Sequence, residues 1–307
     1  MDFVHKSVLF DESVDALNLH DGKIIVDGTA GGGGHSSAIL SRIGNGRLIA
    51  IDQDPDAIKV LHERLDGKGN VTIVKDNFVN IKNILSTLGV DAIDGMLLDL
   101  GVSSHQLDTG ERGFSFHKDA PLDMRMSQEG FSAKDVVNTY SQEQLADIIY
   151  RYGEEKFSRR IASNIVRARQ DKPIETTFEL VDIIKSSMPA AAMRDSHPAR
   201  RTFQAIRIEV NGELDKLSQT LDDAFNCLKV GGRLAVITFH SLEDRMVKER
   251  FNSLCKGCTC PKDFPICVCG KTPRGRLPFK AKAPSEKELA ENPRARSSRL
   301  RVIEKIK

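Results

Sequence analysis

The chain has 307 residues, no tryptophan and only three tyrosines. It also lacks any apolar run near the roughly 18 residues that a membrane-spanning helix needs. Its first residues, which include Asp2, Asp11 and Glu12, do not show the basic segment and apolar stretch of a secretory signal. We therefore expect a cytoplasmic protein without membrane contact. Hydrophobic residues make up 40% of the chain, enough for one large or two modest domains.

Cysteine is scarce outside one segment. Five of the six cysteines lie between Cys255 and Cys269, and the sixth, Cys227, stands alone in an expected helix. A cytoplasmic protein rarely keeps such thiols as disulfides. Close thiol pairs on turns favour a structural zinc site that supports the loop and takes no part in catalysis, although the spacing is looser than in a zinc ribbon. The expected ligands are Cys258, Cys260, Cys267 and Cys269.

Charge is unevenly distributed along the chain. Residues 271–307 carry 12 basic and four acidic side chains, although the net charge of the whole chain is only +2. Such a basic segment predicts contact with a polyanion, and a solvated tail is the alternative. Arginine is dense around Arg200 and Arg201 and again around Arg294 and Arg296. Arginine side chains bind the phosphates of RNA and thereby position it. The alternative for both stretches is that the arginines form internal salt bridges.

Glycine is concentrated at one place. The run Asp27-Gly-Thr-Ala-Gly-Gly-Gly-Gly-His-Ser36 follows a short apolar strand, residues 24–26, and opens a helix. Glycines there let the backbone approach a ligand, and the helix start offers free N–H groups. A second expected strand, residues 48–51, ends in Asp52, where Rossmann-like proteins hold a ribose. The pattern predicts a nucleoside cofactor, and NAD, FAD and S-adenosylmethionine sites share it.

Three further features favour S-adenosylmethionine. A third strand ends in Lys75-Asp-Asn-Phe78, whose aromatic ring is suited to flank an adenine. A fourth ends in Asp99 and a polar segment, at the edge where open α/β sheets bind ligands. The turn at residues 229–233, before a late strand, is common in methyltransferases. Asp99 is placed to accept a hydrogen bond from an amino group during its methylation, and the alternative is a carboxylate that only caps a turn or touches the cofactor.

The order of expected elements predicts an α/β, Rossmann-like methyltransferase fold with an inserted helical domain. Residues 1–108 alternate strands and helices and form the first part. Residues 109–212 have almost no strand signal, and we expect them to form a helical insertion that recognises the substrate. Apparent capping boxes at Ser141 and Thr176 begin two of its helices. Residues 213–307 resume the α/β pattern, carry the cysteine-rich loop and the basic segment, and end in a strand at 299–303 expected at the sheet edge.

Several segments together resemble one family, the bacterial ribosomal small-subunit RNA cytidine-N4 methyltransferases, or MraW family. The resemblance runs from about residue 5 to about residue 303, and its motifs are long and specific. They are residues 27–36, 52–55, 98–104, 111–116, 121–126, 152–155, 197–205, 239–245 and 292–298.

The resemblance implies S-adenosylmethionine-dependent methylation of the N4 amino group of a cytidine in the decoding region of 16S rRNA. It favours an assembled small ribosomal subunit as partner, with no DNA and no membrane. The competing readings are a small-molecule methyltransferase on the same fold and a non-catalytic RNA-binding assembly factor. A small-molecule methyltransferase would not need two arginine-dense segments to bind its substrate.

The resemblance also implies roles for single residues. Cofactor contacts fall on Gly33, Gly34, His35, Asp52 (ribose), Phe78 (adenine), Asp99 and Gln106. Related amino-methylating enzymes often carry Asp/Asn-Pro-Pro-aromatic after the fourth strand, whereas this chain has Asp99-Leu-Gly-Val102. We therefore expect Phe114 or Phe116 to stack on the target base; the alternative is that both are core residues.

Overall fold

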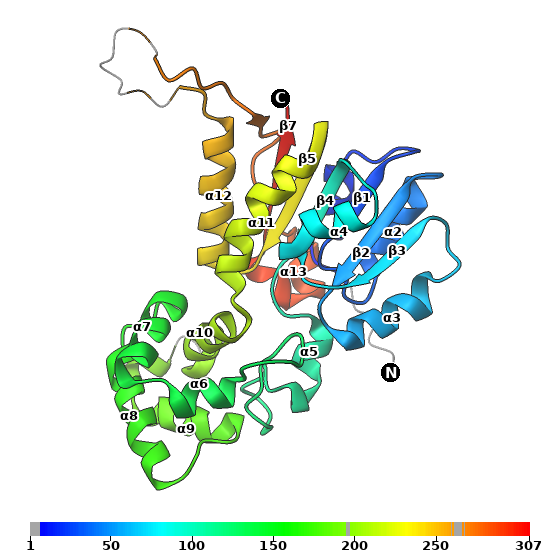
Figure 1. Ribbon diagram of the computed structural model, residues 1–307. Coiled ribbons are helices and arrows are strands. Elements are labelled where there is room, and N and C mark those ends of the chain that lie inside the picture. The colour runs from blue at the N-terminus through cyan, green and yellow to red at the C-terminus, as the bar shows by residue number, and fades with distance from the viewer. Residues whose placement is uncertain (1–6, 195–196, 259, 261–265, 267) are drawn as a thin grey trace. The chain divides into compact units, whose positions relative to one another are not determined.

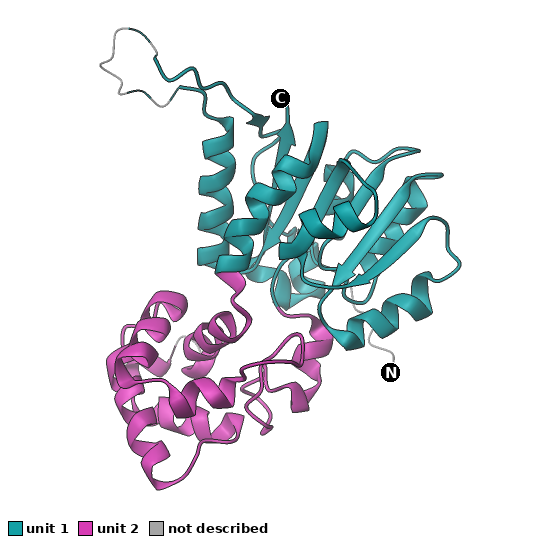
Figure 2. Ribbon diagram, in the orientation of Figure 1, with its two compact units in different colours: residues 1–101, 215–307 teal, residues 102–214 magenta. Residues whose placement is uncertain are grey.

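The computed structural model describes residues 7–194, 197–258, 260, 266 and 268–307. The chain divides into two compact units (Figure 2): unit 1 comprises residues 1–101 and 215–307, and unit 2 comprises residues 102–214. The short helix α5 (Ser104–Asp108), which the sequence places with the first part of the methyltransferase domain, belongs to unit 2. Within the described part of the chain, no helix is both long and apolar enough to cross a membrane.

Unit 1 is built on a seven-stranded sheet of order β3-β2-β1-β4-β5-β7-β6 (Figure 1). Strands β1 to β5 are parallel, β7 is antiparallel to β5, and β6 is antiparallel to β7. The strands are β1 (Ile24–Asp27), β2 (Arg47–Asp52), β3 (Val71–Lys75), β4 (Ile93–Asp99), β5 (Leu228–Thr238), β6 (Gly275–Arg276) and β7 (Arg299–Lys305). Strand order reverses between β1 and β4, so the carboxyl ends of these two strands form the switch point at which such sheets bind ligands. This is the expected Rossmann-like arrangement.

Helices cover both faces of this sheet. They are α1 (Phe10–Ala16), α2 (Gly34–Arg42), α3 (Pro55–Leu65), α4 (Ile81–Thr87), α11 (Glu213–Cys227), α12 (Ser241–Cys255) and α13 (Glu286–Glu291). Because side chains alternate along a strand, Ile49 and Ile51 of β2 belong to the same apolar cluster as residues of α4, α11 and α12, and Leu48 belongs to another with residues of α1 and α2. Apolar residues on both faces explain why the strands read as continuous apolar runs.

Two expectations about the late strands were wrong in detail. The turn at residues 229–233 lies inside β5, whose register jumps from the pair Ile93–Leu228 to the pair Gly95–Arg233, so residues 229–232 bulge from the ladder. Strand β7 is not at the sheet edge, because β6 pairs outside it. A two-residue strand such as β6 is too short to leave an alternating pattern in the sequence.

Unit 2 is helical around its own core. Besides α5, its helices are α6 (Ala133–Thr139), α7 (Gln142–Gly153), α8 (Ser158–Asp171), α9 (Thr177–Ser186) and α10 (Ala199–Asn211). Both expected capping boxes are present, with Ser141 and Gln144 opening α7 and Thr176 and Glu179 opening α9. Each box satisfies N–H groups that a helix start leaves unpaired.

Gly113 is a backbone position in unit 2 that only glycine fits. Its φ is +69°, and a Cβ there would lie 2.4 Å from the Pro121 carbonyl oxygen and 2.7 Å from the Asp123 nitrogen. Main-chain atoms cannot turn aside, so we expect Gly113→Ala to lower the free energy of unfolding by about 3 kcal/mol or more.

The matched control is Gly130→Ala, because Gly130 has φ +83° and no atom of the described residues lies within 4 Å of the added Cβ. That change should cost only about 1 kcal/mol. Urea unfolding of both variants measures the difference, and equal losses would contradict the assignment of a steric role to Gly113.

Candidate active site

Two carboxylates of unit 1 hold the glycine loop between β1 and α2. Ser36 Oγ donates a hydrogen bond to Asp27 Oδ2 at 2.7 Å, and the Gly31 N–H donates to Asp52 Oδ2 at 2.8 Å. The Asp54 N–H donates to the other oxygen of Asp52, also at 2.8 Å. Burial raises the pKa of Asp27 and of Asp52 to about 6. A carboxylate can accept about four hydrogen bonds, so Asp52 keeps acceptor capacity for hydroxyl groups of a ligand.

The fold leaves little room for a side chain at the glycine where the loop begins, and the glycine where the loop ends adopts a left-handed conformation. A Cβ on Gly28 would lie 2.6 Å from Leu98 Cδ2 and 3.3 Å from Phe78 Cβ, which places Phe78 beside the start of the loop. Phe78 is half-buried and packs against the core. Gly33, with φ +75°, is the N-cap of α2, and among the described residues no side chain caps that helix start. Gly34 and His35 are the first residues of α2, so the loop leads to a helix N-terminus suited to polar or anionic groups.

Asp99, at the end of β4, lies next to this loop. Its backbone N–H donates to Thr29 Oγ1 at 2.6 Å. Its Oδ2 lies 3.8 Å from Nδ1 of His35, whose buried ring stacks on Phe10 with centroids 5.4 Å apart. Asp99 Oδ1 is buried without a hydrogen-bond partner among the described residues, although the side chain as a whole is 23% exposed. Such an atom marks a place where a ligand group can complete the hydrogen bonding.

Burial, with smaller contributions from the negative charges of Asp27 and Glu243, raises the pKa of Asp99 to about 8. Asp99 is therefore largely protonated near neutral pH when no ligand is bound. Strongly shifted acids in a ligand-binding position are candidates for catalysis.

Sequence reasoning left the segment from His240 to Asp244 without a role. Glu243 is buried, accepts the Phe239 N–H at 2.8 Å and has Oε1 3.1 Å from His240 Nε2. It thus fixes the turn that follows β5. Arg301 donates two hydrogen bonds to Asp244, at 2.7 and 2.8 Å, and these hold the pKa of Asp244 below its usual range despite burial. Arg301 is therefore engaged internally, which matches the salt-bridge alternative at this position.

The cofactor-contact candidates of unit 1 thus lie around the carboxyl ends of the parallel strands, whereas five other candidates belong to unit 2. The Gln106 side chain is buried and closes a capping box with Ser103. Phe114 is 6% exposed and belongs to the core of unit 2. Phe116 is half-buried, and its ring stacks on His197 with centroids 4.5 Å apart. Arg200 and Arg201, also of unit 2, are exposed near the start of α10. Arg201 nevertheless donates to the Glu154 carbonyl at 3.2 Å and lies 4.0 Å from a carboxylate oxygen of Glu155.

The basic segment of unit 1 is exposed in part. Arg294 and Arg296 are exposed on a short 3₁₀ helix, residues 293–297. A separate cavity of about 490 Å³ has seven lining residues, four of them basic and none acidic. They are Ser253, Leu254, Lys256, Lys271, Thr272, Arg274 and Lys307.

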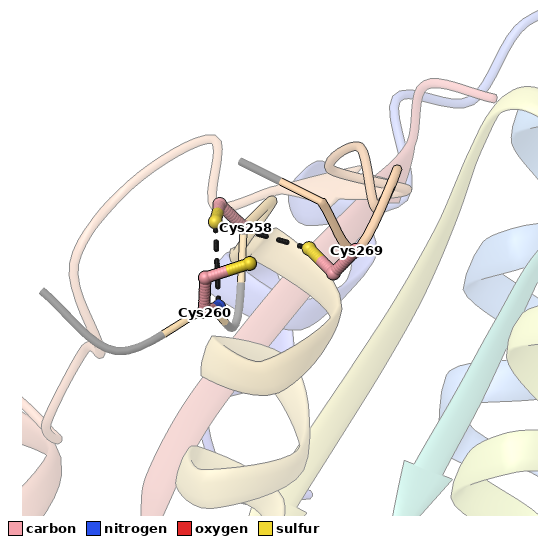
Figure 3. A group of neighbouring side chains, drawn as sticks. All are labelled: Cys258, Cys260 and Cys269. Carbon is pink, nitrogen blue, oxygen red and sulfur yellow. Dashed lines mark hydrogen bonds between the residues drawn. The ribbon is translucent and has the colours of Figure 1, made fainter. Parts of the chain in front are cut away.

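Three of the four expected zinc ligands converge (Figure 3). The Sγ atoms of Cys258, Cys260 and Cys269 all lie within 4.8 Å of one another. The fourth expected ligand, Cys267, lies outside the described residues.

Comparisons with known proteins give one family. The sequence profile of the MraW methylase family matches residues 2–306. The chain is 55% identical over 309 residues to the ribosomal RNA small subunit methyltransferase H of Clostridium botulinum (strain Loch Maree / Type A3), covering 100% of both chains. It is 53% identical over 313 residues to the protein of the same name from Ruminiclostridium cellulolyticum, again covering 100% of both. With a profile match from end to end and relatives more than half identical over their full length, the chain belongs to the MraW methylase family.

Proposed function

We propose that this chain transfers a methyl group from S-adenosylmethionine to the N4 amino group of a cytidine in the decoding region of 16S rRNA. The observation that carries the proposal is the buried, unpartnered carboxylate oxygen of Asp99 beside a glycine loop and a second carboxylate, Asp52. The full-length likeness to small-subunit rRNA methyltransferases supports the substrate class. A ribosomal substrate in turn implies a cytoplasmic enzyme.

The residues around the loop fit S-adenosylmethionine. Asp52 has acceptor capacity for ribose hydroxyls, and Phe78 lies beside the loop where an adenine can pack. Gly33, Gly34 and His35 supply a helix start that no described side chain caps, which suits the polar amino-acid end of the molecule. When bound, S-adenosylmethionine supplies an electrophilic methyl group on a positively charged sulfur. We assign Gln106 to the same contacts by the family resemblance.

Asp99 is the residue that we assign to catalysis. The exocyclic amine of cytosine is a poor nucleophile, because its lone pair is delocalised into the ring. An acceptor that draws on one N–H favours the rehybridised amine that attacks in line. The positively charged sulfur of bound S-adenosylmethionine would lower the pKa of Asp99 and so favour its ionised form, which accepts hydrogen bonds. Positioning supplies much of the remaining rate enhancement, and the amine proton leaves to solvent after transfer.

Aromatic and basic side chains are assigned to the RNA. Phe116 is the better candidate to stack on the target base, because Phe114 is buried in the core of unit 2. The exposed pairs Arg200 with Arg201 and Arg294 with Arg296 are assigned to phosphates. We infer that the RNA is presented within the small ribosomal subunit. We assign zinc no part in this reaction.

Removing the exposed arginine pairs should weaken RNA binding mainly through electrostatics. For Arg294→Ala/Arg296→Ala we expect a slope of log affinity against log salt that is less steep by about 0.7 for each lost phosphate contact. We expect the same decrease in slope for Arg200→Ala/Arg201→Ala. Filter binding of an rRNA fragment at several salt concentrations measures the slope.

The control for this prediction is Arg151→Ala, an exposed arginine outside both arginine-dense stretches that pairs with Asp147 at 3.1 Å. Its slope should equal that of the unmodified protein. Unchanged slopes in both double variants would remove these arginines from the RNA contact.

The proposed function is tested by supplying labelled S-adenosylmethionine together with small subunits that lack the modification, with naked 16S rRNA, or with a mixture of small-molecule amines. We expect label in RNA, with particles as the better substrate. Label only in small molecules would contradict the proposal in favour of a small-molecule methyltransferase. RNA binding without any label would favour an assembly factor.

A further inference from the structure

The connection between α12 and β6 leaves the body of unit 1 and returns to it at nearly the same place. At its base the Arg274 N–H donates to the Leu254 carbonyl at 2.9 Å, and a Cβ on Gly257 would lie 3.0 Å from Pro273 Cδ. The described residues between Lys256 and Thr272 form no helix or strand. Ile266 and Val268 are about three-quarters exposed, at 73% and 74%. A connection of about 20 residues is too short to form a hydrophobic core of its own. Segments of this length are ordinarily stabilised by a disulfide or a metal ion.

The three convergent thiols are placed to supply that cross-link. Cys258 and Cys269 come from the outgoing and returning segments of the excursion. The Cys269 thiol donates a hydrogen bond to Cys258 Sγ, and the 3.8 Å between the two sulfurs is outside bonding distance for a disulfide. The Cys260 N–H donates to Cys258 Sγ at 3.3 Å (Figure 3). Outer hydrogen bonds of this kind orient and stabilise metal-bound ligands. Zinc binds cysteine as the thiolate, so an ion held by these three sulfurs displaces their protons and neutralises the charge that is gathered there.

From these contacts we propose that Cys258, Cys260 and Cys269 bind a structural zinc ion that closes the α12–β6 excursion. Soft thiolate donors in a compact group select zinc over magnesium or calcium. The ion links the outgoing and returning segments of the excursion and so takes the place of a hydrophobic core. It thereby holds the chain just before Lys271, the first residue of the basic segment. The site lies outside the proposed reaction and does not depend on it.

The test measures metal directly on the full chain. Protein purified under reducing conditions without chelator should contain about one zinc per chain by mass spectrometry, and cobalt substitution should give the visible absorption of tetrahedral thiolate-bound cobalt. Cys258→Ser and Cys269→Ser should each lose most of the bound metal. Cys227→Ala, a thiol in α11 and away from the group, should keep it. Circular dichroism checks that the sheet remains folded in each variant.

Two outcomes would overturn the proposal. One is reduced, folded protein that takes up neither zinc nor cobalt when either ion is supplied. The other is a Cys258–Cys269 disulfide, found by non-reducing peptide mapping, in protein isolated from the cytoplasm under thiol-trapping conditions. Methyl-transfer activity plays no part in either readout, so failure here leaves the proposed function untouched.

Discussion

Replacing Asp99 by alanine should lower the rate of methyl transfer by about a hundredfold to a thousandfold, the usual cost of one hydrogen bond made in the transition state. RNA binding should remain, because the contacts assigned to RNA lie elsewhere in the chain. The backbone N–H of Asp99 keeps its bond to Thr29 Oγ1 whatever the side chain is. Single-turnover methylation of small subunits measures the rate, and filter binding measures the affinity.

Asp99→Asn separates charge from shape. The amide oxygen can still accept one N–H but carries no negative charge, so its rate should fall between those of the unmodified protein and Asp99→Ala. The control is Asp66→Ala, an exposed carboxylate paired with His62, which should keep full activity. An Asp99→Ala enzyme within threefold of the unmodified rate would contradict the catalytic assignment.

The same residue predicts a pH dependence of stability. The pKa of Asp99 is about 8 in the folded protein, above the roughly 3.9 of an unfolded aspartate. Between these values the folded state binds more protons than the unfolded state, so the contribution of Asp99 to stability falls as pH rises through this window. Asp99→Asn does not ionise, and its melting temperature without ligand should therefore exceed that of the unmodified protein by a margin that grows from pH 5 to pH 8.

The second large effect is expected at Asp52. Its carboxylate accepts N–H groups from Gly31 and Asp54, and we assign its remaining acceptor sites to the ribose. Asp52→Ala removes charge-assisted hydrogen bonds worth about 1.5–3 kcal/mol, so the affinity for S-adenosylmethionine should fall by about tenfold to a hundredfold. Because burial raises the pKa of Asp52 to about 6, affinity in the unmodified protein should also weaken as pH falls below that value.

Calorimetric titration of S-adenosylmethionine measures this effect, and melting curves without ligand separate loss of affinity from loss of loop structure. Asp52→Asn keeps one carbonyl acceptor and should lose less affinity than Asp52→Ala. An affinity within twofold of the unmodified protein, with the loop intact, would remove Asp52 from the cofactor site.

Much of the fold is predictable because its signals are local. The apolar strands ending at Asp27, Asp52 and Asp99 are buried on both faces, and their runs are visible in the sequence. The capping boxes at Ser141 and Thr176 bind side chain to backbone within three residues. Such features need no knowledge of distant parts of the chain.

The parts that sequence reasoning missed depend on distant pairs. Asp99 meets Thr29 across 70 residues, and Arg301 meets Asp244 across 57. A charge count cannot tell an arginine held by an internal carboxylate from one left exposed, as Arg301 and Arg296 illustrate. Likewise, the burial of Phe114 is set by the packing of helices from across unit 2 and not by its neighbours in sequence.

The measurement that tests the central claim most directly is nucleoside analysis of 16S rRNA labelled by this protein. Small subunits lacking the modification are incubated with labelled S-adenosylmethionine and either the unmodified protein or Asp99→Ala, and the rRNA is digested to nucleosides. We predict label in N4-methylcytidine with the unmodified protein and almost none with the variant. Label in a carbon-methylated cytidine, or equal label with both proteins, would contradict amine methylation assisted by Asp99.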